Sequence, residues 1–199
     1  MNYTVNEIFY SLQGEGLRSG TPNVFVRLTG CNLTCTKDGE AGFDCDTEFS
    51  SGNKYSLEKL LSEMNRIGNG CKNVILTGGE PTLQVDDPLL AALKDDGWYI
   101  AIETNGTKEV PDGVDWITVS PKSAEHTLKQ TEADEVKYVR FTGMAIPKTR
   151  VEADYYLISP AANADWTIDH SVLAWCIDLV KTNPNWRLSV QQHKGWSVR

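Results

Sequence analysis

The sequence of 199 residues predicts an α/β fold built around a largely parallel sheet. Segments rich in Val, Ile, Tyr, Phe and Trp recur along the chain, and several are followed by segments with a helical apolar stripe. Such alternation favours parallel strands joined by right-handed crossovers. The sequence contains no internal repeat, low-complexity tract or linker-like stretch, so we expect one domain spanning residues 1–199.

Strands and helices are each predicted from their own periodicity. The predicted strands are Asn23–Leu28, Asn73–Leu76, Trp98–Ile102, Trp116–Val119, Glu135–Phe141, Tyr155–Ile158 and Trp186–Val190. The predicted helices, which place apolar residues on one face, are Ser56–Ile67, Asp87–Lys94 and Thr167–Lys181.

Six of these strands run directly into polar motifs. In chain order the motifs are Gly30-Cys31, Thr77-Gly78-Gly79-Glu80-Pro81, Glu103-Thr104-Asn105-Gly106, Ser120-Pro121-Lys122, Ser159-Pro160 and Gln191-Gln192-His193-Lys194. A single polar strand end is an ordinary turn. In α/β folds, however, ligands bind at the carboxyl edge of the sheet, so we expect these six groups to converge on one mouth.

Composition limits the classes of partner and location. The formal net charge of −8 argues against a phosphate backbone as a direct partner. No apolar stretch approaches the roughly 20 residues that cross a bilayer, so no membrane partner is expected. The amino-terminal residues lack the basic start and apolar centre of a signal peptide, which predicts a cytoplasmic location with reduced cysteines.

Three cysteines close together are the strongest chemical signal. Cys31, Cys35 and Cys45 follow the first predicted strand, with no fourth cysteine nearby. Three thiolates hold three irons of a cubane cluster and leave the fourth iron open, whereas a closed zinc site wants four ligands. Ordinary buried thiols or a zinc site remain the alternatives. Cys71 precedes its strand and Cys176 lies on an apolar helical stripe, so neither is a good ligand candidate.

Two further features are unusual. Gly78 and Gly79 lack side chains, which lets the backbone approach a ligand closely, although either glycine fits a tight turn equally well. Arg27 is charged inside an otherwise apolar strand. A buried guanidinium needs a partner, which is either the carboxylate of a bound substrate or an internal Asp or Glu.

Together these motifs resemble those of the radical S-adenosylmethionine (SAM) enzymes, for which the three-cysteine loop and Gly78-Gly79-Glu80 are specific. Within that superfamily the chain is similar to the 7-carboxy-7-deazaguanine synthase family, through Leu12-Gln13-Gly14-Glu15-Gly16 and through Cys45-Asp46-Thr47. The likeness covers nearly the whole chain. One departure is that nine residues, Thr36 to Asp44, separate the second and third cysteines where the superfamily usually has two. The family tolerates a lengthened loop.

The resemblance implies an incomplete (β/α)6-type radical SAM barrel with one 4Fe–4S cluster on Cys31, Cys35 and Cys45. The open iron takes the amino and carboxylate groups of SAM. The implied SAM-binding residues are Asp44, Asp46, Gly78, Gly79, Glu80, Glu103, Ser120, Lys122 and Ser159. Thr47 is the implied Mg²⁺ ligand, since a hydroxyl oxygen suits that hard cation.

The implied substrate is a small pterin. Its binding residues, by resemblance, are Leu12, Gln13, Gly14, Glu15, Arg27, Thr77, His193 and Arg199. Among them the Glu15 carboxylate suits the amidine-like donor edge of a pterin. A lone histidine is usually structural, but His193 is expected to end the last strand at the same edge as the cluster. His126 and His170 have no such context and are expected at the surface.

The activity implied is the conversion of 6-carboxy-5,6,7,8-tetrahydropterin to 7-carboxy-7-deazaguanine with loss of ammonia. It is a SAM- and Mg²⁺-dependent radical ring contraction in 7-deazapurine and queuosine biosynthesis. The expected partners are an electron donor such as flavodoxin or ferredoxin and a second copy in a homodimer. Two alternatives stay open: a glycyl-radical-enzyme activase of the same superfamily, and a non-catalytic zinc or iron–sulfur binding module.

Overall fold

A computed structural model of the chain describes residues 2–36, 38–39, 45, 47–162, 167 and 169–198. Within them, nine strands form one sheet in the order β3-β1-β2-β4-β5-β6-β7-β8-β9. Strand β1 (Asn2–Leu12) runs antiparallel to its neighbours β2 (Pro22–Leu28) and β3 (Asn53–Ser56). From β2 onward all neighbours are parallel, through β4 (Asn73–Gly78), β5 (Tyr99–Thr104), β6 (Trp116–Val119), β7 (Glu132–Arg140), β8 (Glu152–Pro160) and β9 (Trp186–Leu188).

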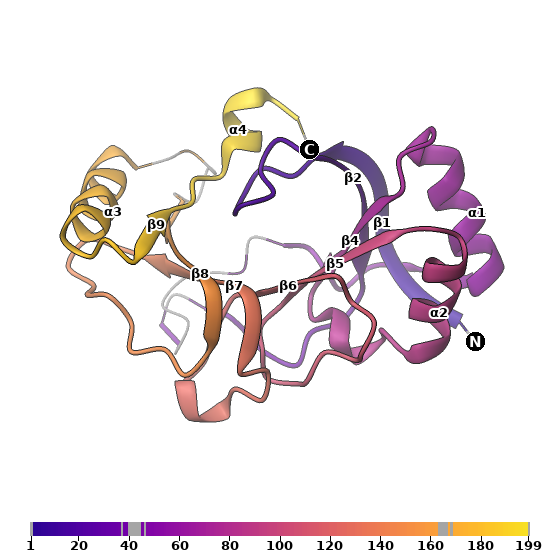
Figure 1. The fold of residues 1–199 in the computed structure, drawn as a ribbon, viewed down its shortest axis with the longest axis horizontal. Coiled ribbons are helices and arrows are strands. Elements are labelled where there is room, and N and C mark those ends of the chain that lie inside the picture. Colours follow the sequence, from indigo (N-terminus) through magenta and orange to yellow (C-terminus); the bar gives the residue numbers. More distant parts are fainter. Residues whose placement is uncertain are drawn as a thin grey trace.

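Three longer helices pack on the sheet, as Figure 1 shows: α1 (Leu57–Gly68) and α2 (Asp87–Asp95) beside β1 to β5, and α3 (His170–Thr182) beside β8 and β9. Each begins at a residue whose side chain accepts a hydrogen bond from a backbone N–H of the first turn: Ser56, Asp86 and Asp169. Two 3₁₀ turns, η1 (Pro81–Leu83) and η2 (Glu125–Thr127), and the short helix α4 (Gln192–Trp196) complete the described elements.

The core lies mainly on the helix-covered face of the sheet. Leu60 and Met64 of α1 and Leu89 and Leu93 of α2 pack there against alternate residues of β2, β4 and β5. A second cluster places Val172 and Cys176 of α3 against β7 and β8. We call the opposite face, which α1 and α2 leave uncovered, the inner face.

The predicted α/β class is confirmed, and the described sheet is open, as in an incomplete barrel. All seven predicted strands and all three predicted helices are present. Strand β6 has the predicted bounds, Trp116–Val119, and the other elements have one or both ends shifted. Strands β1 and β3 were missed. In β1 a register shift between Val5 and Glu7 moves the buried side chains from one face to the other, which interrupts the alternation that reveals a strand.

Two boundary predictions were wrong at the carboxyl-terminal end. Helix α3 begins at His170 rather than Thr167, because Asp169 caps it. The last strand ends at Leu188, and residues from Gln192 onward form α4. His193 therefore lies in a short helix and does not end a strand. In the described part of the chain, no helix is both long and apolar enough to traverse a bilayer.

Candidate active site

The cysteine loop leaves the carboxyl end of β2 and closes back on itself. The Gly30 N–H donates to the Phe49 carbonyl oxygen (2.8 Å), and the Cys45 N–H donates to the Cys35 carbonyl oxygen (3.3 Å). Cys31 and Cys35 are half-buried, and Cys45 is exposed. Among the described residues, no three His, Cys, Asp or Glu side chains are grouped to bind a single metal ion. A cubane does not require such a group, because each thiolate binds a different iron.

The Gly78-Gly79-Glu80 turn packs against the start of this loop. The Glu80 N–H donates to the Gly30 carbonyl oxygen (2.8 Å). A Cβ atom at Gly79 would lie 2.1 Å from that same oxygen and 3.0 Å from the Cys31 Cβ. Gly78 has a φ of 129°, and a Cβ there would lie 2.1 Å from the Leu28 carbonyl oxygen. Both glycines are therefore required by close backbone approach at the cysteine loop.

The donor set fits an iron–sulfur cluster with an open iron. It offers three soft thiols on one loop, next to a backbone surface that carries no side chains at Gly78 and Gly79. Burial raises the pKa of the Cys31 thiol, and the nearby Glu80 and Cys45 raise it further. Iron coordination removes the thiol proton and so compensates for this unfavourable environment.

Glu80 itself is fully buried, at 0% exposure. Its carboxylate accepts hydrogen bonds from the Thr82 hydroxyl (2.6 Å) and N–H (3.1 Å), the Thr104 hydroxyl (2.7 Å) and the Asn105 N–H (2.7 Å). These bonds tie the end of β4 to the end of β5. The structure thus places Glu80 beneath the mouth, where it supports the turn that carries Gly79.

The other predicted SAM-binding residues lie at neighbouring strand ends. The Lys122 ammonium donates to the Ser120 hydroxyl (2.7 Å) after β6, and Ser159 is buried near the end of β8. Glu103 accepts a hydrogen bond from the Gln13 amide (2.7 Å). Asp44 and Asp46 lie outside the described residues, as does Arg199 of the predicted substrate site.

Thr47, the predicted magnesium ligand, lies close to the third cysteine of the loop. Its backbone carbonyl oxygen is 3.6 Å from the Cys45 Sγ, and the residue is half-buried. A hydroxyl at this place is a suitable oxygen ligand for Mg²⁺ next to the cluster loop.

On the inner face, side chains form two rows across the strands. One row is apolar and consists of Phe9, Phe25, Ile75, Ala101 and Trp116. The row two residues further along each strand is polar and consists of Arg27, Thr77, Glu103, Thr118 and Glu135. A ligand bound at the carboxyl edge of the sheet would contact this polar row.

The loop after β1 crosses this polar row. Because β1 is antiparallel to β2, the loop starts at the amino end of the parallel strands and reaches over the inner face toward α4 (Figure 1). The Gly14 carbonyl oxygen accepts a hydrogen bond from the Gln192 N–H (2.8 Å), and a Cβ at Gly14 would lie 2.1 Å from the His193 Nδ1. Gly14 and His193 are therefore in direct contact, so the structure brings these two predicted substrate residues together.

The Glu15 carboxylate of this loop is held by two side chains. It accepts hydrogen bonds from the Lys137 ammonium of β7 and from the Gln191 amide (2.8 Å). Burial opposes ionisation of this carboxyl, but the Lys137 charge outweighs it and lowers the Glu15 pKa to about 2. Burial lowers the pKa of His193 by more than the nearby Glu15 carboxylate raises it, so the imidazole is neutral at neutral pH.

Arg27 pairs with Glu7 across the β1–β2 ladder, at 3.1 Å between Nη1 and Oε2. Arg27 therefore has an internal carboxylate partner, which was one of the two partners that its sequence position predicts. The guanidinium also lies over the Phe9 ring, and its buried Nε has no hydrogen-bond partner among the described residues. Arg27 thus keeps an unused donor on the inner face.

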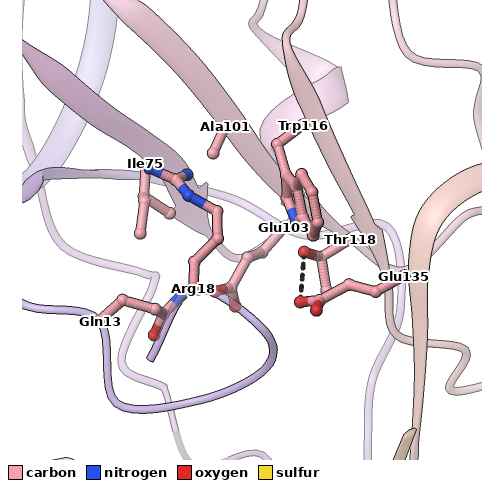
Figure 2. A pocket seen from close by; sticks show the side chains of 8 residues that line it. All are labelled: Gln13, Arg18, Ile75, Ala101, Glu103, Trp116, Thr118 and Glu135. Carbon is pink, nitrogen blue, oxygen red and sulfur yellow. Dashed lines mark hydrogen bonds between the residues drawn. The ribbon is translucent and has the colours of Figure 1, made fainter. Parts of the chain in front are cut away.

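Figure 2 shows a narrow pocket below the loop, lined by Gln13, Arg18, Ile75, Ala101, Glu103, Trp116, Thr118 and Glu135. Arg18 donates to the Asn23 side-chain oxygen (2.9 Å) and lies over the Tyr99 ring. The Thr118 hydroxyl donates to Glu135 (2.9 Å). The pocket continues the polar row under the loop after β1, residues 13–21, which we call the substrate loop.

Leu12 differs from the other predicted substrate residues. It ends β1 at 36% exposure. Leu12 lines a separate surface groove together with Tyr10, Ser11, Ser197 and Val198. Thr77, by contrast, lies in the polar row beside Arg27.

Four residues that hold the substrate loop were given no role by the sequence: Glu135, Lys137, Ser189 and Gln191. Of these, Gln191 does lie in one of the six polar motifs expected at the mouth. The Glu135 carboxylate accepts from the Leu17 N–H (2.9 Å), and the Ser189 hydroxyl accepts from the Gly16 N–H (2.9 Å). A signal was available for two of them, because Glu135 and Lys137 are charged and alternate with apolar residues in a predicted strand, as Arg27 does.

Comparison with known proteins identifies the family, although no family model matches the chain. The 7-carboxy-7-deazaguanine synthase of Bacteroides thetaiotaomicron is 40% identical over 196 residues, covering 98% of each chain. That of Burkholderia multivorans is 37% identical over 214 aligned positions, covering 100% of each. A crystal structure of QueE from Escherichia coli superposes with a TM-score of 0.72 at 28% identity, covering 97% of this chain and 95% of that one. The chain therefore belongs to the 7-carboxy-7-deazaguanine synthase family, whose members are radical SAM lyases.

Proposed function

We propose that this chain converts 6-carboxy-5,6,7,8-tetrahydropterin to 7-carboxy-7-deazaguanine with release of ammonia, at the mouth formed by the cysteine loop, the polar row and the substrate loop. The observation that carries the proposal is the position of Glu15. It lies ionised over the inner face, in contact with the carboxyl-terminal segment, while Arg27 offers a cation on the same face. The full-length relatives favour this activity over a glycyl-radical-enzyme activase or a non-catalytic metal module.

The substrate would be recognised at its two ends. The Glu15 carboxylate has about four lone-pair sites, of which Lys137 and Gln191 use one each, so it can still accept from the amidine-like edge of a pterin. Arg27 would bind the substrate carboxylate through donors that Glu7 does not use. Thr77 and His193 would complete the site, and Gln13 would present its amide between Glu103 and the ligand.

Cys31, Cys35 and Cys45 would hold the iron–sulfur cluster, and Gly78, Gly79, Glu80, Glu103, Ser120, Lys122 and Ser159 would surround SAM. When bound, the cluster and SAM supply the 5′-deoxyadenosyl radical that starts the reaction. The chain's own contribution is to position the substrate. The backbone of Gly79, which carries no side chain, would leave room for SAM beside Cys31. Thr118 and Glu135 of the polar row are buried and would limit the access of bulk water.

Three further assignments complete the proposal. Thr47 would bind Mg²⁺ through its hydroxyl. A flavodoxin or ferredoxin would supply the electron, approaching the exposed Cys45 side of the loop. The enzyme would act as a homodimer in the cytoplasm, which light scattering on the purified holoenzyme and fractionation of the host cell would test.

The central experiment uses anaerobically reconstituted protein with SAM, Mg²⁺, a chemical reductant and the tetrahydropterin. We expect 7-carboxy-7-deazaguanine and ammonia in equal amounts, with SAM regenerated and not consumed. The matched control replaces all three loop cysteines by alanine, and we expect that variant to bind no cluster and make no product. Turnover by the control, or no product from an iron-loaded wild type, would overturn the proposal.

A further inference from the structure

The substrate loop is clamped at every second residue by inward-facing side chains of the sheet. The Gln13 amide donates to Glu103 of β5, Glu15 accepts from Lys137 of β7, and the Leu17 N–H donates to Glu135 of β7. Since Glu135 and Lys137 are two residues apart on one strand, their side chains share a face. Strand β7 thus provides two of the three attachments.

Lys137 differs from the other two sheet residues in that it is a cation and contacts the carboxylate assigned to the pterin. It is 7% exposed. An ammonium buried to this extent needs a charge partner, and its Nζ donates to the Glu15 Oε2. The two residues are 122 positions apart in the chain, so the ion pair joins the loop after β1 to strand β7 of the sheet.

We propose that Lys137 is a positioning residue for the reaction: through its ion pair it holds Glu15 as a carboxylate, with the orientation that accepts hydrogen bonds from the amidine-like edge of the pterin. This inference rests on the proposed function, because it takes Glu15 as the pterin-binding group. Lys137 itself need not touch the substrate. Gln191 holds the second Glu15 oxygen, so the two partners together fix the plane of the carboxylate.

The charges around Glu15 determine what happens when Lys137 is replaced. Lys137 of β7 and His193 of α4 act on Glu15 directly. Glu135 of β7 and Glu103 of β5 act on Lys137, and Lys194 of α4 acts on His193. Burial favours the protonated acid, and Lys137 is the largest influence that lowers the pKa of Glu15. Without Lys137, burial of the Glu15 carboxyl favours the protonated acid. A protonated Glu15 loses acceptor capacity, so pterin binding should weaken at low pH and recover as the pH rises.

The test measures binding of 6-carboxypterin, the redox-stable aromatic form of the substrate, to the anaerobic holoenzyme with SAM at about pH 6 and about pH 8. For Lys137→Met we expect a loss of affinity of about 10- to 100-fold at the lower pH and a clearly smaller loss at the higher pH. Lys137→Arg should restore binding to within about 3-fold of wild type at both, since it keeps the charge. Lys129→Met, at an exposed lysine, is the matched control and should bind as wild type does.

A double-mutant cycle separates this proposal from the function on which it rests. Glu15→Gln should lose affinity independently of pH, and adding Lys137→Met to it should cost little more. If Glu15→Gln binds 6-carboxypterin normally, the assigned role of Glu15, and with it the proposed function, is wrong. If Glu15→Gln is impaired but Lys137→Met binds as wild type at both pH values, only the role of Lys137 is refuted.

A measurement on the wild type keeps the test decisive should Lys137→Met fail to fold. Infrared difference spectra between wild type and Glu15→Gln report the protonated carboxyl band of Glu15 directly. We expect no such band in the wild type at about pH 6, because Lys137 keeps the group ionised. A Glu15 band at that pH in the folded wild type would contradict the proposal without any change at Lys137.

Discussion

Two ion pairs lie on the inner face, and each contains a residue assigned to the substrate. Arg27 pairs with Glu7, and Glu15 pairs with Lys137. Both pairs are at least partly shielded from water, so each partner sets the orientation of the other. A ligand can therefore bind only to the donors of Arg27 and the acceptors of Glu15 that their partners leave unused.

Arg27→Gln should weaken the binding of 6-carboxypterin by about 10- to 100-fold, because a charge-assisted hydrogen bond to the ligand carboxylate is lost. The measurement compares binding of 6-carboxypterin with that of pterin, which lacks the carboxylate. The variant should bind pterin as wild type does. Equal loss for both ligands would show that Arg27 acts on the fold and not on the carboxylate.

Among the elements, the turn between β4 and η1 packs closely against the cysteine loop and the end of β5. Gly79 touches the Gly30 carbonyl and Cys31, and Glu80 gathers four donors from η1 and the end of β5. The turn therefore has two structural roles. Its glycines leave space beside the cysteine loop, and Glu80 joins the ends of β4 and β5 by hydrogen bonds. Each can be tested separately.

Gly79→Ala should lower the iron content after anaerobic reconstitution to less than half that of wild type, because the added Cβ would lie 3.0 Å from the Cys31 Cβ and 2.1 Å from the Gly30 oxygen. Iron and sulfide analysis per chain provides the measurement. Gly195→Ala is the matched control, since its Cβ would meet no atom within 4 Å. Full cluster loading in Gly79→Ala would show that the loop tolerates displacement at this point.

Glu80→Gln should destabilise the cluster-free protein by about 2 kcal/mol, since an amide nitrogen would face buried donors that a carboxylate now accepts. Urea unfolding followed by circular dichroism measures this. Glu109→Gln, at an exposed position, should stay within about 0.5 kcal/mol of wild type. Equal stability of the two variants would mean that the four donors find other partners when Glu80 is changed.

Across the whole molecule, the buried Glu15 carboxylate couples folding to pH. Its pKa in the fold is about 2, below its ordinary value of 4.5, because Lys137 and its hydrogen bonds outweigh burial. A depressed pKa adds stability that is complete above the ordinary value and is lost as the pH falls through the folded value. Glu135 acts in the opposite direction, because burial raises its pKa.

Comparing wild type with Glu15→Gln should isolate this contribution. The difference in their unfolding free energies should be constant near neutral pH and shrink as the pH falls from about 4.5 toward about 2. Denaturant unfolding at a series of pH values gives both curves, and the Glu135 effect cancels because both proteins contain it. A difference that does not change over this window would mean that Glu15 is not ionised by its partners in the fold.

Local patterns were enough to predict α1, whose leucines repeat at helical spacing and whose cap is Ser56, and to predict most of the parallel strands. They were not enough for β1, where a register shift breaks the alternation, nor for α4, which follows a strand of three residues. Short elements of this kind are stabilised mainly by what they pack against, so their own sequences carry little signal.

The sequence by itself determined the cysteine loop, the glycine turn that follows β4 and the presence of the parallel strands, because each depends on residues close together in the chain. Only the tertiary structure decided that the loop after β1 crosses the inner face, that Lys137 meets Glu15 and that His193 lies against Gly14. These contacts join residues more than a hundred positions apart. They arise from the antiparallel direction of β1 and the curvature of the sheet, which no local spacing encodes.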